Sequence, residues 1–498
     1  MPPRHRRRRR AHALAVALFL VGLLPLTAPT AARQDAVPVA GHPRLWITAD
    51  DLPRLRSWAT DANPFWRDGL AVLAETAKAE MDAGALPDDD PGDYVAGNSE
   101  AFAELFAFLS LIHPDEAAGQ DYAQRARTLL MSMVTEAANG PAAGEPFRDP
   151  QFATSGRSRW WGEGFALTVD WIYPTLSAQD KETIRRVFLR WAEEIATTGY
   201  PDGLQNLTPN SAQTLDRGLM RWAGNNYFTA GMRNIGLMAM AFDPADDPDG
   251  ALAAHLEHAI GARLRVVDEL LRTDAAGGLA PEGFEYSPQT LAYIAQFLLA
   301  LDTAGQDDPT RWGSQVDWRD NPFWDKLLPA YLHSLSPAPL VQPEAGVHAY
   351  LPAWYGDGQE YLAPDMIGVL GPLALLDARM GDPARLDAIR WIQTHLPPGG
   401  AEELVTERVG NAYVFRDAIL YFLLFDPAAP PPRDPRPGLP LSHFAPGLGR
   451  LFARTSWAED ATWFTYALGW IGIDHQHAEG NQFEFYRNGE WLTKERTG

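Results

Sequence analysis

The chain of 498 residues contains no cysteine. Disulfide bonds, thiolate nucleophiles and cysteine-based zinc sites are therefore excluded. Basic residues are also scarce: 42 Lys and Arg stand against 64 Asp and Glu, which gives a formal net charge of −22. This balance argues against nucleic acid as a partner, because a phosphate backbone requires a basic surface. It does not exclude an acidic polysaccharide, since a local basic cluster can bind what the whole surface repels.

Long apolar runs are absent except at the amino terminus. There, Arg4 and Arg6–Arg10 precede the apolar run Ala11–Leu26, and small residues follow up to Ala32. This order predicts a signal peptide over residues 1–32, and hence a secreted or periplasmic protein with no stable membrane span after cleavage. An uncleaved anchor is the alternative, although the run is short for a membrane span. Cleavage removes six arginines and no acid, which changes the net charge from −22 to −28.

Helical periodicity dominates from Leu52 to about Phe425, where apolar residues recur at spacings of three and four. Gly, Pro and Asp separate the runs, as expected of turns. The pattern predicts helices over Ala101–Ile112, Ile184–Ile195, Met232–Phe242, Leu252–Leu271, Leu291–Leu301 and Ala418–Phe425. Many similar helices joined by short turns favour stacked hairpins, in a solenoid or a closed toroid. Residues 33–426 are the predicted helical domain.

A proline-rich linker, residues 427–440, separates this domain from a different pattern. Thr462–Leu468 and Gln482–Leu492 are rich in aromatic and β-branched residues, and Asn488-Gly489 predicts a hairpin turn. Residues 441–498 therefore predict the start of a β-sheet domain with three or four strands. So few strands make a poor independent domain, so we expect a truncated one. The sequence does not indicate an oligomeric state.

Two histidines, His475 and His477, lie two residues apart in what the pattern predicts to be a strand. Their imidazoles would then share one face, with Asp474 and Gln476 on the other. Such a pair suits a metal site, or one catalytic group beside one metal ligand. A polar strand face without chemistry is the alternative.

A second polar cluster contains Trp222, Asn225, Asn226 and Tyr227, ahead of a helix expected to begin near Thr229. The two amides suit helix capping, and they equally suit hydrogen bonds to a carboxylate. The indole of Trp222 is one of 17 in the chain and offers a flat apolar platform for a sugar ring.

A third cluster, Pro281-Glu282-Gly-Phe-Glu-Tyr286, is predicted to be a loop before a long apolar helix. Tyr286 can donate or accept a proton at the mouth of a helical barrel. The alternative is a packing tyrosine with its hydroxyl group satisfied at the surface.

These clusters, in this order, resemble the heparinase II/III-like polysaccharide lyases. The stretch His42-Pro-Arg-Leu-Trp-Ile-Thr-Ala-Asp-Asp resembles the opening of that family's helical domain, and Asp170-Trp-Ile-Tyr-Pro-Thr resembles its central helix–turn–helix. Leu448–Trp457 and Asp474-His-Gln-His-Ala-Glu-Gly-Asn resemble its first strands and its histidine motif, the most specific part. The resemblance covers nearly all of residues 42–498. It implies an incomplete (α/α) toroid, then an antiparallel β-sandwich, with a cleft between them and β-elimination on uronate-containing polysaccharides.

That elimination requires the enzyme to neutralise the uronate carboxylate, remove the C5 proton and protonate the leaving oxygen at C4. The resemblance implies Asn225 and Asn226 for the first task. It implies Tyr286 and His475 for proton transfer, one on each side of the cleft, with the choice of base set by the stereochemistry of the uronate. The substrate-binding set is completed by Tyr227, Glu282 and Trp222.

No cofactor is implied for catalysis, but His477 resembles a structural zinc ligand of the family. Complete sites add an acidic residue after the hairpin, for which Glu495 and Lys494 are equally aligned, and a later histidine that would lie beyond Gly498. This chain is therefore not expected to complete the zinc site. Many relatives also have a histidine where this chain has Tyr227. The missing imidazolium argues against highly charged, heparin-like substrates.

Two other functions fit the same pattern. A glycoside hydrolase needs two facing carboxylates, and the sequence offers Glu163, Asp170, Glu282 and Glu285 without singling out a pair. A non-catalytic carbohydrate-binding protein would bind polysaccharide without turnover.

Overall fold

The structure is a computed structural model, and residues Ala36–Gly498 form one compact unit. It describes residues 38–85, 98–140, 150–154, 156–198, 204–205, 207–208, 217–341, 348–357, 362–397, 417–469, 472–473, 475–478 and 480–494. The predicted signal peptide, Asp474 and Glu495 lie outside the described residues.

Helices dominate the described chain up to Leu424. They are α1 (Leu52–Trp58), α2 (Ala71–Asp82), α3 (Asn98–Ile112), α4 (Glu116–Asn139), α5 (Gly156–Trp160), α6 (Glu163–Trp171), α7 (Ala178–Thr198), α8 (Arg217–Arg221), α9 (Asn226–Met240), α10 (Ala251–His258), α11 (Arg265–Arg272), α12 (Gly283–Thr303), α13 (Pro309–Trp312), α14 (Phe323–Ser334), α15 (Leu362–Arg379), α16 (Ala384–His395) and α19 (Ala418–Leu424). Every helical run predicted from periodicity falls on a helix, although Ala241, Phe242 and Phe425 lie just past the helix ends. The run Leu252–Leu271 continues from α10 to α11 through a π-helical turn. In the described parts, no helix is long and apolar enough to cross a membrane.

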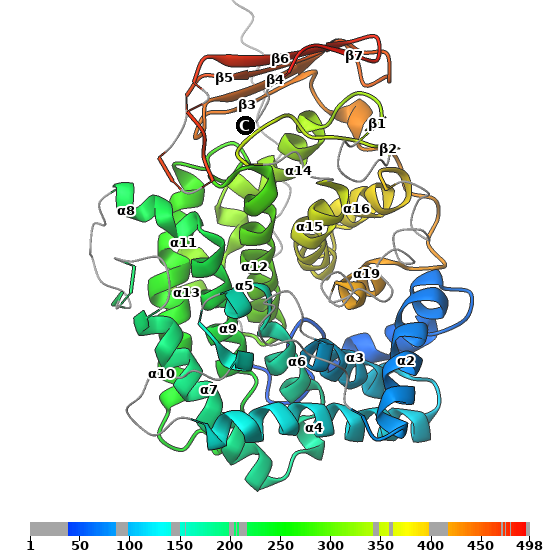
Figure 1. Ribbon diagram of the computed structural model, residues 1–498, viewed down its shortest axis with the longest axis vertical. Helices are drawn as coiled ribbons and strands as arrows, with labels where there is room; N and C mark the ends of the chain where they lie inside the picture. Colours follow the sequence, from blue (N-terminus) through cyan, green and yellow to red (C-terminus); the bar gives the residue numbers. More distant parts are fainter. Residues whose placement is uncertain are drawn as a thin grey trace, which may run out of the picture. The chain divides into compact units, whose positions relative to one another are not determined.

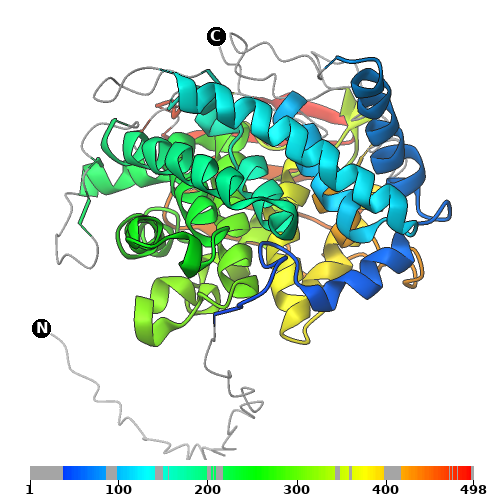
Figure 2. The ribbon, with the colours of Figure 1, turned by 90° about the horizontal axis from the view of Figure 1, so that it is seen from below.

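Consecutive helices pair as hairpins. The short connection between α3 and α4 reverses the chain, and the two helices pack together, as do α15 and α16. The long helix α12 packs between α9 and α15. The hairpins follow one another around an incomplete (α/α) toroid, as predicted (Figure 1). Seen from below, α4 and α7 run side by side (Figure 2).

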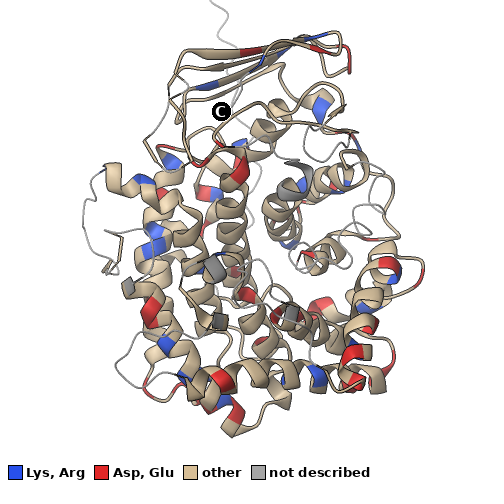
Figure 3. Ribbon diagram, in the orientation of Figure 1, with Lys and Arg blue, Asp and Glu red and all other residues tan. Residues whose placement is uncertain are grey.

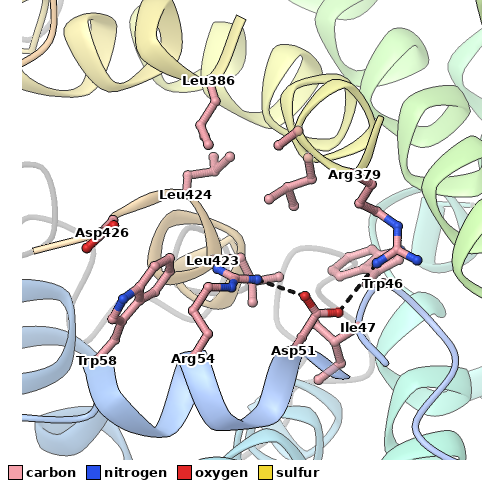
Figure 4. A pocket seen from close by; sticks show the side chains of 12 residues that line it. Trp46, Ile47, Asp51, Arg54, Trp58, Arg379, Leu386, Leu423, Leu424 and Asp426 are labelled. Atoms are coloured by element: carbon pink, nitrogen blue, oxygen red, sulfur yellow. Dashed lines mark hydrogen bonds and ion pairs between the residues drawn. The ribbon is translucent and has the colours of Figure 1, made fainter. Parts of the chain in front are cut away.

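The first and last helices of this arrangement meet around a small cavity. Side chains of α1, α15, α16 and α19 line a volume of about 320 Å³ (Figure 4). Asp51 lies 2.9 Å from Arg54 and 3.5 Å from Arg379, and Trp58 and Leu386 add apolar walls. The carboxylate of Asp51 thus interacts with two arginines. Its contact with Arg379 links the region of α1 at the start of the helical domain to α15 near its end.

The opening segment of the described chain docks on a buried carboxylate. Asp170, in α6, is fully buried and accepts hydrogen bonds from the Nδ1 of His42 (2.6 Å) and the backbone amides of Arg44 (2.8 Å) and Leu45 (2.9 Å). The His42 ring stacks on Tyr173 with centroids 3.9 Å apart. Two of the stretches that carry the family resemblance therefore bind each other.

The chain after the proline-rich stretch forms an antiparallel sheet. Among the described residues its five strands are β3 (Ser442–Ala445), β4 (Arg450–Arg454), β5 (Trp463–Ala467), β6 (Gln482–Arg487) and β7 (Glu490–Thr493), paired in that order. A separate two-stranded ribbon pairs β1 (Leu340–Val341) with β2 (His348–Ala349). The hairpin predicted at Asn488-Gly489 joins β6 to β7, and both residues have positive φ. The expected three or four strands were too few, because β3 is short and partly polar.

The sheet is attached to the end of α14. The guanidinium of Arg454 donates to three backbone carbonyls there, those of Leu332 (3.4 Å), His333 (3.1 Å) and Leu335 (2.7 Å). The indole of Trp463 donates to the same His333 carbonyl, at 3.1 Å. Carbonyls at a helix carboxyl terminus have no partner within the helix, so these strand side chains satisfy groups that the helix leaves open.

Charged residues of both signs are interspersed along the helices (Figure 3). Several are paired between neighbouring helices, such as Arg127 with Asp180 at 2.8 Å. In this view the acids do not gather on a separate face.

Candidate active site

Three segments far apart in sequence meet where the sheet adjoins the helices. The backbone amide of Phe284, at the start of α12, donates to the carbonyl of Tyr355 at 3.0 Å. The side-chain amide of Gln476 donates to the carbonyl of Pro281. Gly356 has a positive φ, and a Cβ there would lie 2.8 Å from the His475 carbonyl, so only glycine allows the approach. These contacts fix the positions of the side chains that follow.

His475 and His477 both bind one carboxylate, that of Asp357. The Nδ1 of His475 lies 2.5 Å from Oδ2, and the Nε2 of His477 lies 2.8 Å from Oδ1. The predicted strand is wrong: residues 475–478 are irregular, and His475 has a φ of 61°, which no strand contains. The two imidazoles nevertheless converge, because the irregular segment folds around Asp357.

Hydrogen bonds set the charge of this carboxylate. Burial alone would raise the pKa of Asp357, but the bonds from His475 and His477 outweigh it and hold the pKa below the ordinary value. The carboxylate of Asp357 occupies Nδ1 of His475. The other ring nitrogen, Nε2, is therefore the one left for proton transfer.

Tyr286 lies against His475. The two rings stack with centroids 3.7 Å apart and an angle of 14° between their planes. Two expectations fail here. Tyr286 belongs to the first turn of α12 and not to a loop, and a stacked pair cannot stand on opposite sides of a cleft.

The phenol of Tyr286 stays protonated in neutral solution. Burial raises the pKa of Tyr286 to about 12, and the neighbouring Glu285 carboxylate adds to the increase. The positive charge of Arg159 acts in the opposite direction. A neutral phenol is a proton donor.

The paired asparagines lie at the start of α9, which begins at Asn226 and not near Thr229. Asn225 is the N-cap, and its Oδ1 accepts from the backbone amide of Tyr227 at 2.9 Å. Its Nδ2 donates to Glu282 at 2.7 Å, and the backbone amide of Asn226 donates to the same carboxylate at 3.0 Å. Both asparagines and Glu282 are buried. The capping interpretation thus holds for Asn225, and Glu282 joins the start of α9 to the start of α12.

Asn226 keeps capacity for one more bond. Its Nδ2 donates to Gln289 at 3.2 Å, whereas its Oδ1 has no hydrogen-bond partner among the described residues. A buried carbonyl oxygen without a hydrogen bond lowers the stability of the fold by about 1–3 kcal/mol. An incoming hydroxyl group would relieve that cost.

Half-buried Tyr227 and Trp222 lie beside these amides, on α9 and on the short turn before it. The guanidinium of Arg159, in α5, stands 4.9 Å from the centre of the Tyr227 ring. The structure brings together Tyr286, His475 and His477, and likewise Asn225, Asn226 and Glu282, all of which the sequence offers as candidates. Arg159, Gln289 and Asp357 were not predicted from the sequence.

Local signals for the missed residues are weak. Arg159 immediately precedes Trp160 and Trp161, whose ring faces can attract a cation. Asp357 follows Gly356 in a turn-prone stretch. Neither pattern is specific without the partner from another segment.

A metal site does not follow from the described residues. The described partner of His477 is Asp357, Glu495 lies outside the described residues, and in the described part no group of three His, Cys, Asp or Glu side chains is arranged to hold a metal. The described donors do not fit a structural zinc ion, which needs four ligands.

Of the four carboxylates considered for hydrolysis, Glu285 is partly exposed and the other three are engaged inside the protein. Glu163 lies 2.5 Å from Arg233, Asp170 binds His42, and Glu282 binds Asn225. All three carboxylates are buried. They do not form the facing pair that hydrolysis requires.

Comparison with known proteins finds heparinases by structure alone. No protein-family model and no curated protein matches the sequence. Among solved structures, a heparinase III matches with 10% identity and a TM-score of 0.41, over 80% of this chain and 50% of that one. A second heparinase III (12%, 0.42) and the heparan sulfate lyase HepC from Pedobacter heparinus (12%, 0.38) each match over 91% of this chain and 64% of theirs. The chain thus spans about half to two thirds of the length of these structures.

Proposed function

We propose that this chain is an exported polysaccharide lyase that cleaves uronate-containing polysaccharide by β-elimination. The observation that carries the proposal is the contact between Tyr286 and His475, with Asp357 bound to the Nδ1 of the imidazole. Two groups able to move protons stand side by side, and a carboxylate orients one of them. This combination serves a reaction that removes one proton and delivers another.

In this proposal His475 is the base. Asp357 on Nδ1 fixes the tautomer that leaves the Nε2 lone pair free, and it stabilises the imidazolium that forms when the C5 proton is taken. Tyr286 is the acid, because its phenol is protonated and can donate to the departing O4. The electron pair of the C5–H bond forms the C4–C5 double bond, and the C4–O bond breaks.

The stacked arrangement also favours one stereochemistry. Nε2 of His475 and Oη of Tyr286 reach a bound sugar from the same side, which suits a syn elimination. H5 and O4 lie on the same face of D-glucuronate and D-mannuronate residues, and on opposite faces of L-guluronate and L-iduronate residues. The proposed substrate therefore contains D-glucuronate or D-mannuronate.

Ultraviolet absorbance tests the reaction, because elimination creates a conjugated double bond and hydrolysis does not. The protein is mixed with hyaluronan, chondroitin, heparan sulfate, an ulvan-like polymer and the two block types of alginate. Polymannuronate and polyguluronate form the matched pair, since their residues differ only in configuration at C5. We expect absorbance to rise with polymannuronate or a glucuronate polymer, and not with polyguluronate.

Three results would contradict the proposal in distinct ways. Chain shortening without absorbance would indicate a hydrolase. Binding without shortening would indicate a carbohydrate-binding protein. Faster cleavage of polyguluronate than of polymannuronate would be consistent with a lyase but would contradict the proposed syn elimination.

A further inference from the structure

One buried carboxylate, that of Asp274, holds two arginines of α8. Its Oδ1 lies 2.9 Å from the Nε of Arg217 and also accepts from Nη2 of the same guanidinium, and its Oδ2 lies 2.8 Å from the Nε of Arg221. Burial alone would raise the pKa of Asp274, but the hydrogen bonds from both arginines outweigh it and hold the pKa below the ordinary value. The carboxylate is therefore ionised, and two positive charges stand against one negative charge.

The two guanidiniums keep N–H groups for a ligand. The side chain of Arg217 is 63% exposed and that of Arg221 is 29% exposed. Because the guanidinium of Arg217 is planar and its Nε–Nη2 edge faces Asp274, its Nη1 points away from the carboxylate. In the described part of the chain, neither this Nη1 nor the two Nη atoms of Arg221 have a hydrogen-bond partner. Guanidinium groups of this kind bind carboxylates and similar oxyanions through charge-assisted hydrogen bonds.

The loop that contains Asp274 is fixed against the sheet. The backbone amide of Gly447, in the turn between β3 and β4, donates to the carbonyl of Ala276 at 3.0 Å, and a Cβ at Gly447 would lie 2.5 Å from the Asp274 carbonyl. The Nε2 of His443, in β3, lies 2.8 Å from the carbonyl of Gly277. The carboxylate that positions the arginines is thus held in place where the helices meet the sheet, and α8 lies against α11 beside it (Figure 1).

Both segments of this cluster lead into the proposed active site. A single turn, Trp222–Gly224, separates Arg221 from the cap residue Asn225, and a stretch of this length spans at most about 14 Å. The loop after Asp274 continues to Glu282, which accepts from Asn225 at 2.7 Å. A polysaccharide bound at the proposed catalytic pair covers such a distance with a few sugar residues.

We infer that Arg217 and Arg221 bind an anionic group, a carboxylate or a sulfate, on a sugar residue other than the one that is cleaved. The inference rests on the proposed function for the polysaccharide itself. The nearby Arg272 does not offer the same charge, because it lies 2.8 Å from Asp268 and 2.9 Å from Asp320. There two acids surround one cation, whereas at α8 two cations share one acid.

Binding without turnover tests the inference, in a Tyr286→Phe background that should not cleave. The probes are hexasaccharides of polymannuronate, native and carboxyl-reduced, and of chondroitin, sulfated and unsulfated, and calorimetry gives the affinities. Arg217→Gln should lower one of the two preferences for the more anionic form about 10-fold, the lower part of the range for a charge-assisted hydrogen bond. A change in the mannuronate pair identifies a carboxylate as the ligand, and a change in the chondroitin pair identifies a sulfate.

Three further variants control the experiment. Arg185 pairs at 2.6 Å with Asp247, which follows the end of α9 opposite to Asn225, so Arg185→Gln removes the same charge and should change neither preference. Arg217→Lys keeps the charge without the planar group and should give an intermediate preference. Arg221→Gln leaves Arg217 on the buried carboxylate and should reproduce the loss, so it carries the test if Arg217→Gln does not fold.

An equal loss for both members of each pair, or no loss for any probe, would overturn the inference. If a polymer is cleaved but both preferences survive in Arg217→Gln, the inference alone fails. If no polymer is cleaved but a preference depends on Arg217, the lyase proposal fails and the anion site stands. If the protein with unaltered arginines binds none of the probes, both fail.

Discussion

Two regions of this molecule each contain an aspartate, a histidine and a tyrosine in nearly the same arrangement. In the first, the Nδ1 of His42 lies 2.6 Å from Asp170, and the imidazole stacks on Tyr173 with centroids 3.9 Å apart and an interplanar angle of 14°. This region joins the opening segment to α6.

In the second, the Nδ1 of His475 lies 2.5 Å from Asp357, and the imidazole stacks on Tyr286 with centroids 3.7 Å apart and the same angle of 14°. Local geometry alone therefore does not separate a structural Asp–His–Tyr group from a proposed catalytic one.

What separates the two is exposure and unused bonding capacity. The side chains of His42 and Asp170 are 6% and 0% exposed, whereas those of His475 and Asp357 are 24% and 34% exposed. The second nitrogen of His42 meets Asp243 at 3.3 Å. The Nε2 of His475 has no hydrogen-bond partner among the described residues. One group is complete in itself, and the other has an open position for a substrate.

The two tyrosines give the largest expected contrast. Tyr286→Phe should lower turnover about 10²–10⁴-fold, because it removes the proton donor, and should leave stability nearly unchanged. Tyr173→Phe removes the hydrogen bond that the phenol donates to Asp246 (2.6 Å) and the one that it accepts from the backbone amide of Asp243 (3.0 Å). It should cost about 1–2 kcal/mol without affecting turnover. Initial rates from ultraviolet absorbance and urea unfolding measure the two effects. Equal loss of turnover in both variants would break the comparison.

The two aspartates should differ next. Asp170→Ala leaves two buried backbone amides and His42 without their acceptor, and should destabilise the protein by about 3–5 kcal/mol. Asp357→Ala removes a partly exposed carboxylate and should change stability by less than about 1 kcal/mol. It should nevertheless lower turnover, because the imidazole of His475 loses its orienting group. Thermal unfolding of both variants measures the difference in stability. A greater loss of stability in Asp357→Ala than in Asp170→Ala would contradict the prediction.

The smallest effect concerns acid stability. Hydrogen bonds from Tyr173 and, at 2.9 Å, from Lys181 hold the pKa of Asp246 below its ordinary value. Asp246 therefore binds fewer protons in the folded than in the unfolded chain. Its stabilisation is complete above the ordinary carboxyl pKa of about 4 and is lost as the pH falls through the lowered folded pKa.

Asp246→Asn should cost less than about 1 kcal/mol at neutral pH and should flatten the decline of stability below pH 4. Urea midpoints between pH 2 and 7 are the measurement, with Asp249→Asn as an exposed control. A steeper acid decline in Asp246→Asn would show that the sign is wrong.

Periodicity predicted most of the fold because helices and hairpins are local. The apolar spacing in Leu252–Leu271 and the Asn488-Gly489 turn each specify their own backbone. The same reasoning failed at His475, where alternation predicted a strand. The left-handed backbone there is set by contacts with Pro281 and Gly356, which a local pattern does not contain.

The site was predicted in parts for the same reason. Tyr286 and His475 stand out as groups able to transfer protons, but the stretch from Pro281 to Tyr286, which contains the start of α12, was predicted to be a loop. Asp357 lies 118 residues from His475 in sequence, and only the folded chain brings them together. Sequence therefore identifies chemically capable residues more readily than the partners that orient them.

The hydrogen bonds from Arg454 to the end of α14 affect how cooperatively the sheet and this helix unfold. Because one strand side chain satisfies three helix carbonyls, β4 cannot detach without exposing buried polar groups of the helix. Amide protons in β4 and in the last turn of α14 should therefore exchange with solvent in one shared opening. His475 lies between β5 and β6, whereas Tyr286 lies on α12, so their stacking exists only while sheet and helices stay docked. Arg454 thus links the lifetime of the proposed catalytic pair to the unfolding of a helix that carries neither residue.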